Sequence, residues 1–189
     1  MAHFESLDPA TGSVIAEHEI FSKAQVEDAV AIAHDAKHQW QKLGFHGRRR
    51  VLEKWNGVIG KRSEDLAQLI ALETGKPIGD ARLEVSVAIS HLSWAAEKAG
   101  YYLKEQRRTP GILMFNMSAI VQRVPVGVVG VIGPWNYPMF TPMGSIAYAL
   151  AAGNTVVFKP SEYTPGVGKL LESTFDEVAP FPGIFKCIT

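Results

Sequence analysis

Two polar clusters in the sequence each follow a short apolar run, and their residue types suit binding and chemistry at oxygen atoms. Pro-Trp-Asn at 134–136 follows the run 126–132, and Lys-Pro-Ser-Glu at 159–162 ends the run 155–159. The amide of Asn136 could stabilise a developing oxyanion without adding charge to the ground state. A lysine and a glutamate three residues apart offer a donor and an acceptor, a combination that suits a vicinal diol such as a ribose.

The elements expected around these clusters would bring them together. The runs 126–132 and 155–159 predict strands without alternation, as in a sheet covered on both faces. Residues 146–152 between them predict the end of a helix. Strands joined by helices predict a parallel sheet with right-handed crossovers, which binds ligands outside its carboxyl edge. We therefore expect Asn136 and Glu162 to lie near each other at that edge.

A further helix and strand are expected after the second cluster. Thr164 predicts an N-cap with Pro165 at the first helical position, and this helix should reach about Ala179. The segment GIFKCIT at 183–189 predicts a third strand. Cys187, within it, is expected to be structural because the surrounding strand is apolar.

Upstream of the sheet, the sequence predicts a hairpin and four helices. The hairpin covers residues 4–20 and turns at 8–12, and Ser22 with Gln25 forms a capping box for the first helix. The expected apolar faces of the four helices are Val26, Ala29, Val30, Ala33, Ala36 and Trp40; Val51, Leu52, Trp55, Val58 and Ile59; Leu66, Leu69 and Ile70; and Val85, Ala88, Ile89, Leu92 and Ala96.

The ends of the later helices and the segment that follows them are also predicted. The third helix should start at Ser63 and end near Gly75, with Glu73 at its end as a structural residue. The fourth should run from about Gly79 to Gly100. Residues 101–110 are expected to be a connector, and ILMFN (112–116) and SAIVQRVP (118–125) are expected to be two strands. The fold class is therefore α/β, with N-terminal helices and the start of a parallel Rossmann-like sheet.

Composition argues against several classes of protein. The chain has 189 residues, 47% hydrophobic and 20% charged, and Lys plus Arg equals Asp plus Glu at 19 each, so no nucleic-acid partner is indicated. No apolar run reaches the ~18 residues of a membrane span, and the N-terminus lacks a signal-peptide core. A single cysteine excludes an internal disulfide framework, and we expect a reducing cytoplasm.

Plainer interpretations of the candidate residues remain open. Trp135 would then be a core residue, Asn136 a turn residue, and Lys159 with Glu162 a surface ion pair of little energetic value.

The dinucleotide fingerprint G-x-G-x-x-G is absent. His34 and His38 have a spacing that can bind metal, but no third ligand accompanies them, so no metal site is expected.

The motifs VPVGVVGVIGPWNYP (124–138) and GNTVVFKPSEYTP (153–165) resemble those of the aldehyde dehydrogenase superfamily. The segments DPATGSVIAEHEI, RRRVLEKW, LIALETGKP and ARLEV resemble the N-terminal region of that family, so the resemblance covers essentially the whole chain. It implies NAD(P)-dependent oxidation of an aldehyde to a carboxylic acid by a homo-oligomer. It also implies three parts: 1–110, a hairpin and helices that pack on the cofactor domain; 111–125, a hairpin-like segment toward the subunit interface; and 126–189, the first strands and helices of the dinucleotide-binding domain.

The same resemblance implies roles for the candidate residues. Asn136 matches the asparagine that stabilises the oxyanion. The positions expected to bind the cofactor are Ile132, Pro134, Trp135, Asn136, Lys159, Ser161 and Glu162. Because a carboxylate at Glu162 would repel a 2′-phosphate, NAD is expected rather than NADP.

The resemblance also leaves essential parts of the reaction unaccounted for. The family's nucleophilic cysteine and general-base glutamate lie beyond the matched region, and no residue of this chain stands in for either. We therefore expect the 189-residue chain alone to be inactive. The alternative hypothesis is an inactive truncated pseudoenzyme, or a fragment that binds a nucleotide or a partner without chemistry.

Overall fold

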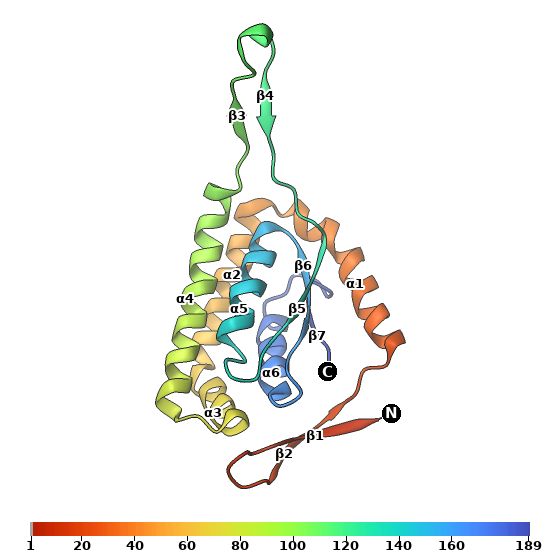
Figure 1. The fold of residues 1–189 in the computed structure, drawn as a ribbon, viewed down its shortest axis with the longest axis vertical. Helices are drawn as coiled ribbons and strands as arrows, with labels where there is room; N and C mark the ends of the chain where they lie inside the picture. The colour runs from red at the N-terminus through yellow and green to blue at the C-terminus, as the bar shows by residue number, and fades with distance from the viewer. Residues whose placement is uncertain (1) are drawn as a thin grey trace.

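The computed structural model describes residues 2–189 as stacked layers of helices on either side of a parallel sheet (Figure 1). The sheet consists of β5 (Val128–Ile132), β6 (Thr155–Lys159) and β7 (Phe185–Cys187), in that order. Helix α1 contacts the sheet from one side, and α5 and α6 pack on the other, with α2, α3 and α4 outside them. The helices are α1 (Lys23–Lys42), α2 (Gly44–Lys61), α3 (Ser63–Thr74), α4 (Ile78–Tyr102), α5 (Phe140–Ala152) and α6 (Pro165–Asp176). The expected α/β fold class is confirmed.

The upstream elements follow the predicted pattern closely. A hairpin of β1 (His3–Leu7) and β2 (Val14–Glu19) precedes α1, which begins with the predicted capping box at Ser22. The helix buries Ala29, Ala33, Ala36 and Trp40, whereas Val30 is 41% exposed, so its expected place in the core is wrong. Successive helical residues lie about 100° apart, which turns Val30 out of the narrow stripe that meets the sheet.

The end of α3 and the core of the outer layer also agree with the sequence. Gly75 ends α3 in the left-handed conformation, with φ of 72°, as a helix C-terminus favours. In α2, Trp55 is fully buried and its Nε1 donates to Thr174 Oγ1 of α6 at 2.9 Å.

Among the described residues, no helix combines the length and the apolar character needed to cross a bilayer.

The sheet is parallel, as predicted, but β5 is less covered than expected. Strand pairing runs from Val128 opposite Thr155 to Ile132 opposite Lys159. In β6 the first four residues are buried, as predicted. In β5, by contrast, Ile132 is 82% exposed, because this strand lies at one edge of the described sheet and no helix covers its last residue. The prediction of β7 within GIFKCIT is confirmed.

A two-stranded arm projects from the body beyond the end of α4 (Figure 1). Its strands are β3 (Gln106–Arg108) and β4 (Ala119–Val121), paired antiparallel. The expected strand over 112–116 is wrong: Ile112–Met114 forms a 3₁₀ helix, η1, at the tip, and the paired strand lies within the supposed connector. Pro110 and Gly111, whose φ is 74°, break the strand before the apolar run begins.

The two helices that follow β5 and β6 are capped from outside their own sequence. The N-cap of helix α5 is Met139, whose side chain makes no capping bond, and Glu84 of α4 caps the helix instead. Its Oε1 accepts hydrogen bonds from the backbone N–H groups of Met139 at 2.9 Å and Phe140 at 3.1 Å. A carboxylate at this position satisfies orphan donors and complements the helix dipole.

Glu73 of α3 does the same for α6. Thr164 does occupy the N-cap position with Pro165 after it, but its hydroxyl makes no capping bond, contrary to expectation. Instead, Glu73 Oε1 accepts from Gly166 N at 2.9 Å and Oε2 from Val167 N at 3.0 Å. Burial raises the pKa of the Glu73 carboxyl from its ordinary 4.5 to about 7, against the opposite effect of these two N–H groups.

We predict that Glu73 makes the stability of this chain depend on pH. Because its folded pKa of about 7 lies above its ordinary 4.5, the folded state holds a proton that the unfolded state has released within that window. The free energy of unfolding should therefore fall as pH rises from 4.5 to 7, by about 3 kcal/mol at ~1.4 kcal/mol per pKa unit. Urea unfolding at several pH values measures this change.

The matched comparison is Glu73→Gln against Glu64→Gln, the latter at an exposed glutamate paired with Arg82. Glutamine at 73 does not titrate, so this variant should lose the decline between pH 4.5 and 7. The pKa of Glu64 is lowered from 4.5 by Arg82, so the pH dependence that Glu64 causes lies below about pH 4.5, and Glu64→Gln should keep the decline between pH 4.5 and 7. An undiminished decline in Glu73→Gln would show that another group causes it.

Candidate functional site

The two polar clusters leave the sheet at the same edge, as predicted. Ile132 is the register partner of Lys159 on the neighbouring strand. One residue later, Gly133 N donates to Lys159 O at 2.9 Å, which holds the two exits together. A Cβ on Gly133 would lie 2.9 Å from the ring of Phe158, so this close approach requires glycine.

The turn after β5 presents its side chains outward. Trp135 is 54% exposed and Asn136 is exposed, which contradicts the plainer interpretation of Trp135 as a core residue. Pro134 is half-buried beneath them. The backbone oxygen of Asn136 accepts a hydrogen bond from Lys76 Nζ at 2.7 Å. The backbone of this turn is therefore held while its amide side chain faces solvent.

The cluster after β6 is organised around a carboxylate. Lys159 Nζ lies 3.9 Å from Glu162 Oε2, with both side chains largely exposed. The buried Ser161 accepts from Tyr163 N and places its own hydroxyl 3.3 Å from Glu162 Oε2. The pKa of Glu162 is lowered, chiefly by a hydrogen bond from its own backbone N–H and further by Lys159 and Ser161. Glu162 is therefore negatively charged at neutral pH.

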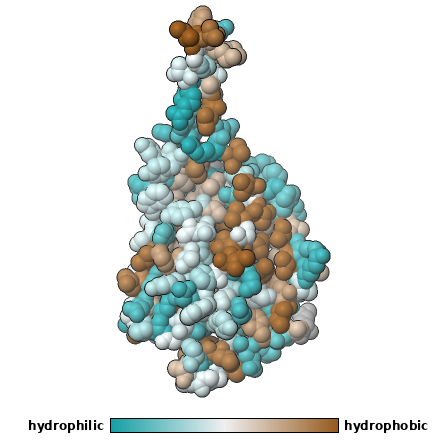
Figure 2. Space-filling view, viewed as in Figure 1, coloured by the Kyte–Doolittle hydropathy of each residue, from teal (hydrophilic) through white to brown (hydrophobic). Residues whose placement is uncertain are grey.

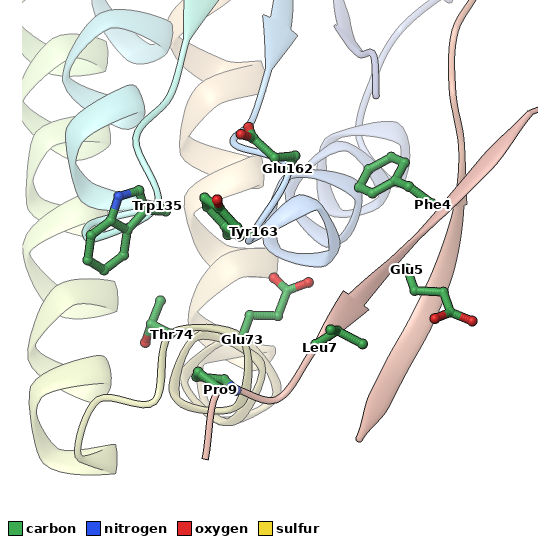
Figure 3. Close-up of a pocket in the computed structure, with 9 residues that line it drawn as sticks. All are labelled: Phe4, Glu5, Leu7, Pro9, Glu73, Thr74, Trp135, Glu162 and Tyr163. Carbon is green, nitrogen blue, oxygen red and sulfur yellow. The ribbon is translucent and has the colours of Figure 1, made fainter. Parts of the chain in front are cut away.

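Two adjacent cavities share Glu162 as a wall. The larger, about 520 Å³, also has Trp135 and Tyr163 in its lining, and residues of β1 and the end of α3 complete it (Figure 3). The smaller, about 350 Å³, is lined by Lys159, Ser161 and Glu162 together with Phe4 and Ile20 of the N-terminal hairpin. All of the predicted site residues except Ile132, Pro134 and Asn136 line one of these spaces.

Sequence reasoning missed two residues that touch the site. Lys76 Nζ lies 2.6 Å from Glu84 Oε2 and 4.3 Å from the ring centroid of Tyr137, beside Asn136. Glu84 carried a detectable signal, since it falls between Ala81 and Val85 on the apolar stripe of α4, where an uncompensated carboxylate is costly. Lys76 carried none, because its contact with Asn136 spans 60 residues.

Cys187, the only cysteine, is fully buried in β7. Burial raises the pKa of its thiol to about 12, so the reactive thiolate is scarce at neutral pH. Its backbone N–H donates to Glu172 Oε1 at 3.0 Å. The structure therefore agrees with the prediction of a structural cysteine.

Comparison with known proteins gives a family match over the whole chain. The family model described as "Aldehyde dehydrogenase family" matches residues 1–189. A probable succinate-semialdehyde dehydrogenase [NADP(+)] of Sinorhizobium fredii is 38% identical over 162 residues, which are 86% of this chain and 32% of that protein. The chain thus spans about a third of the length of the curated relatives it matches.

Solved structures give the same result. An aldehyde dehydrogenase from Brucella melitensis biovar abortus superposes with a TM-score of 0.94 at 30% identity, over all of this chain and 38% of that one. An NAD-dependent aldehyde dehydrogenase from Sinorhizobium meliloti superposes with a TM-score of 0.93 at 33% identity, again over all of this chain and 38% of that one. The chain therefore belongs to the aldehyde dehydrogenase family.

Proposed function

We propose that this chain contributes the oxyanion donor and one wall of the cofactor site to an NAD-dependent enzyme that oxidises an aldehyde to a carboxylic acid. The observation that carries the proposal is the register of Ile132 with Lys159, which brings the turn of Asn136 and the carboxylate of Glu162 to one sheet edge. Ligands of parallel sheets bind outside this edge. Sequence and fold similarity to aldehyde dehydrogenases supports the reaction type.

The residues after β6 fit the ribose of a dinucleotide. Lys159 is a cation with free donors, and the exposed, charged Glu162 is an acceptor beside a cavity of about 350 Å³. Together they can donate to and accept from the two hydroxyls of a diol. The negative charge of Glu162 would repel a 2′-phosphate, which favours NAD. The relatives carry names of both kinds, NADP(+) and NAD-dependent.

The residues after β5 fit the reacting end of the substrate. When bound, NAD accepts the hydride that leaves the aldehyde carbon. The amide N–H of Asn136 would donate to the carbonyl oxygen as negative charge develops there, in a turn whose backbone is already held. Trp135 would cover the adjacent cavity and limit access of water. A nucleophilic thiolate would come from the part of such an enzyme that this chain does not span, because Cys187 is buried with a raised pKa.

The arm made by β3, η1 and β4 supports a further part of the proposal, a homo-oligomer. Its tip exposes large apolar side chains, Ile112 at 88%, Leu113 at 94% and Phe115 at 87%, and it is the apolar end of the projecting arm in Figure 2. Such a patch on a narrow projection suits contact with a second subunit. The lone buried cysteine is compatible with a reducing cytoplasm.

Burial of Cys187 also favours a second candidate, a module that binds a nucleotide without chemistry. In that case the 189-residue chain should bind NAD by itself. Calorimetric titration separates the two candidates: micromolar affinity of the isolated chain would support the binding module. Weak or absent binding would support a site that is completed by other parts of an enzyme.

We predict that the amide of Asn136 is needed for turnover. The assay uses a joined enzyme in which this chain replaces the matched third of the Sinorhizobium fredii relative. Asn136→Ala should lower kcat by ~10²–10³, the usual loss for one oxyanion donor, with little change in cofactor Kd. Asn136→Asp should be at least as damaging, since it keeps the shape and turn preference but lacks the donor. Normal turnover in Asn136→Asp would indicate that the residue only forms the turn.

We predict that Glu162 sets cofactor affinity and preference. In the same joined enzyme, Glu162→Ala should raise the Kd of NAD by ~10–100-fold, because hydrogen bonds to a charged acceptor are lost. The kcat at saturating NAD should stay nearly unchanged. Glu162→Gln should narrow the preference for NAD over NADP by removing the negative charge. Calorimetry with both cofactors measures this, with Glu53→Gln, an exposed glutamate on α2, as the control. An unchanged ratio in Glu162→Gln would refute the charge argument.

A further inference from the structure

The turn that carries Asn136 is fastened at both ends by one buried ion pair. At its start, Lys76 Nζ donates to the backbone oxygen of Asn136 at 2.7 Å. At its end, Glu84 Oε1 accepts from Met139 N and Phe140 N. The two fastening groups are joined to each other at 2.6 Å. The segment between residues 136 and 140 is thus held by a single connected network.

The network is buried, and a buried charged side chain is costly unless it is paired. The side chain of Glu84 is fully buried and that of Lys76 is only 14% exposed. Buried ion pairs are weak stabilisers of a fold compared with apolar side chains of similar size, so stability alone explains this one poorly. In some proteins such a pair is kept because it fixes a specific arrangement of the chain.

The side-chain contacts of Lys76 lie at the turn and at Glu84, which holds the end of the turn. Besides Glu84 and the Asn136 oxygen, its ammonium lies 4.3 Å from the ring centroid of Tyr137, the next residue in the turn. No hydrogen bond of the Asn136 side-chain amide is found within residues 2–189, so the orientation of that amide depends on its backbone. Lys76 is the side chain that fixes this backbone.

We propose that Lys76, held by Glu84, is a positioning residue that orients the Asn136 amide for catalysis. This inference rests on the proposed function, in which Asn136 donates to the substrate oxygen. The ammonium acts through the peptide group of Asn136 and does not touch the substrate. A displacement of about 1 Å at such a donor is enough to cost a large part of its effect on the rate.

The first test uses variants that remove the contact without leaving a buried charge. Lys76→Met alone would strand the carboxylate of Glu84, so the informative variant is Lys76→Met with Glu84→Gln. Glutamine keeps an oxygen for Met139 N and Phe140 N, and methionine keeps most of the lysine stem. In the 189-residue chain, hydrogen exchange should become at least ~10-fold faster at the backbone amides of Met139 and Phe140, which are hydrogen-bonded to Glu84, and stay unchanged in β6. The control is Lys98→Met, an exposed lysine elsewhere on α4.

The second test is a cycle of variants in the joined enzyme. The double variant should lower kcat by ~10–100-fold and leave the cofactor Kd unchanged. Arginine in place of methionine at position 76 should restore most of the lost kcat, because arginine supplies a donor. In an Asn136→Ala background, the same double variant should lower kcat by less than ~3-fold, because the group to be positioned is already gone. A merely structural role would lower kcat equally in both backgrounds.

The outcomes separate this inference from the proposed function. If Asn136→Ala leaves kcat intact, the proposed function fails and this inference falls with it. If Asn136→Ala lowers kcat but the double variant acts equally in both backgrounds, or not at all, the proposed function stands and Lys76 is not a positioning residue. Unchanged hydrogen exchange at the amides of Met139 and Phe140 would also overturn it.

Discussion

Two buried carboxylates at helix N-termini determine how the layers of this molecule fit together. Glu84 and Glu73 are each 3% exposed, and each accepts two backbone N–H groups from a helix that follows a strand of the parallel sheet. A carboxylate in such a position is costly unless several donors surround it. The helices in turn lack side-chain caps of their own. The carboxylates of the outer layer and the N-terminal N–H groups of the crossover helices therefore satisfy each other where the two layers meet and water is excluded.

The two carboxylates are compensated differently. Glu84 has a cation, Lys76, at 2.6 Å, whereas Glu73 has no such cation within the described residues. Desolvation therefore dominates at Glu73 and raises its pKa to about 7. At the opposite end of α5, Trp40 Nε1 donates to Leu150 O and Arg48 Nε donates to Ala151 O. Helix α5 thus has an anion at its N-terminus and a cation at its C-terminus, the arrangement that its dipole favours.

The sequence was sufficient to predict the parts of the fold that depend on local pattern and turn chemistry. The parallel arrangement of 126–132 and 155–159 follows from the alternation of strands and helices. The capping box at Ser22 and the end of α3 at Gly75 follow from local capping residues. The predicted strand over 112–116 in the arm was wrong because residues 112–114 are apolar but face solvent at the tip. The polar segment 106–108 is the one that pairs with β4. Hydrophobicity indicates burial, and these residues are exposed.

The candidate site was predictable where it depends on the edge of the sheet. Asn136 and Glu162 could be placed there because parallel strands end together. The supporting contacts of Lys76 and Glu73 could not, since each joins segments that are 60 or more residues apart. Glu84 could have been found as a charged residue on an apolar stripe. The groups that it caps, however, are backbone N–H groups, which every residue except proline carries and which no pattern of side chains reveals.

The cap on α6 also restricts the routes by which this sequence can evolve. A Cβ on Gly166 would lie 2.7 Å from Glu73 Oε1, so a side chain at position 166 would require the carboxylate of Glu73 to shift. Alanine at 166 would therefore disturb the cap that this carboxylate provides. Loss of the glutamate first would leave α6 without its cap. The effect of a substitution at one of these positions should therefore depend on the residue at the other.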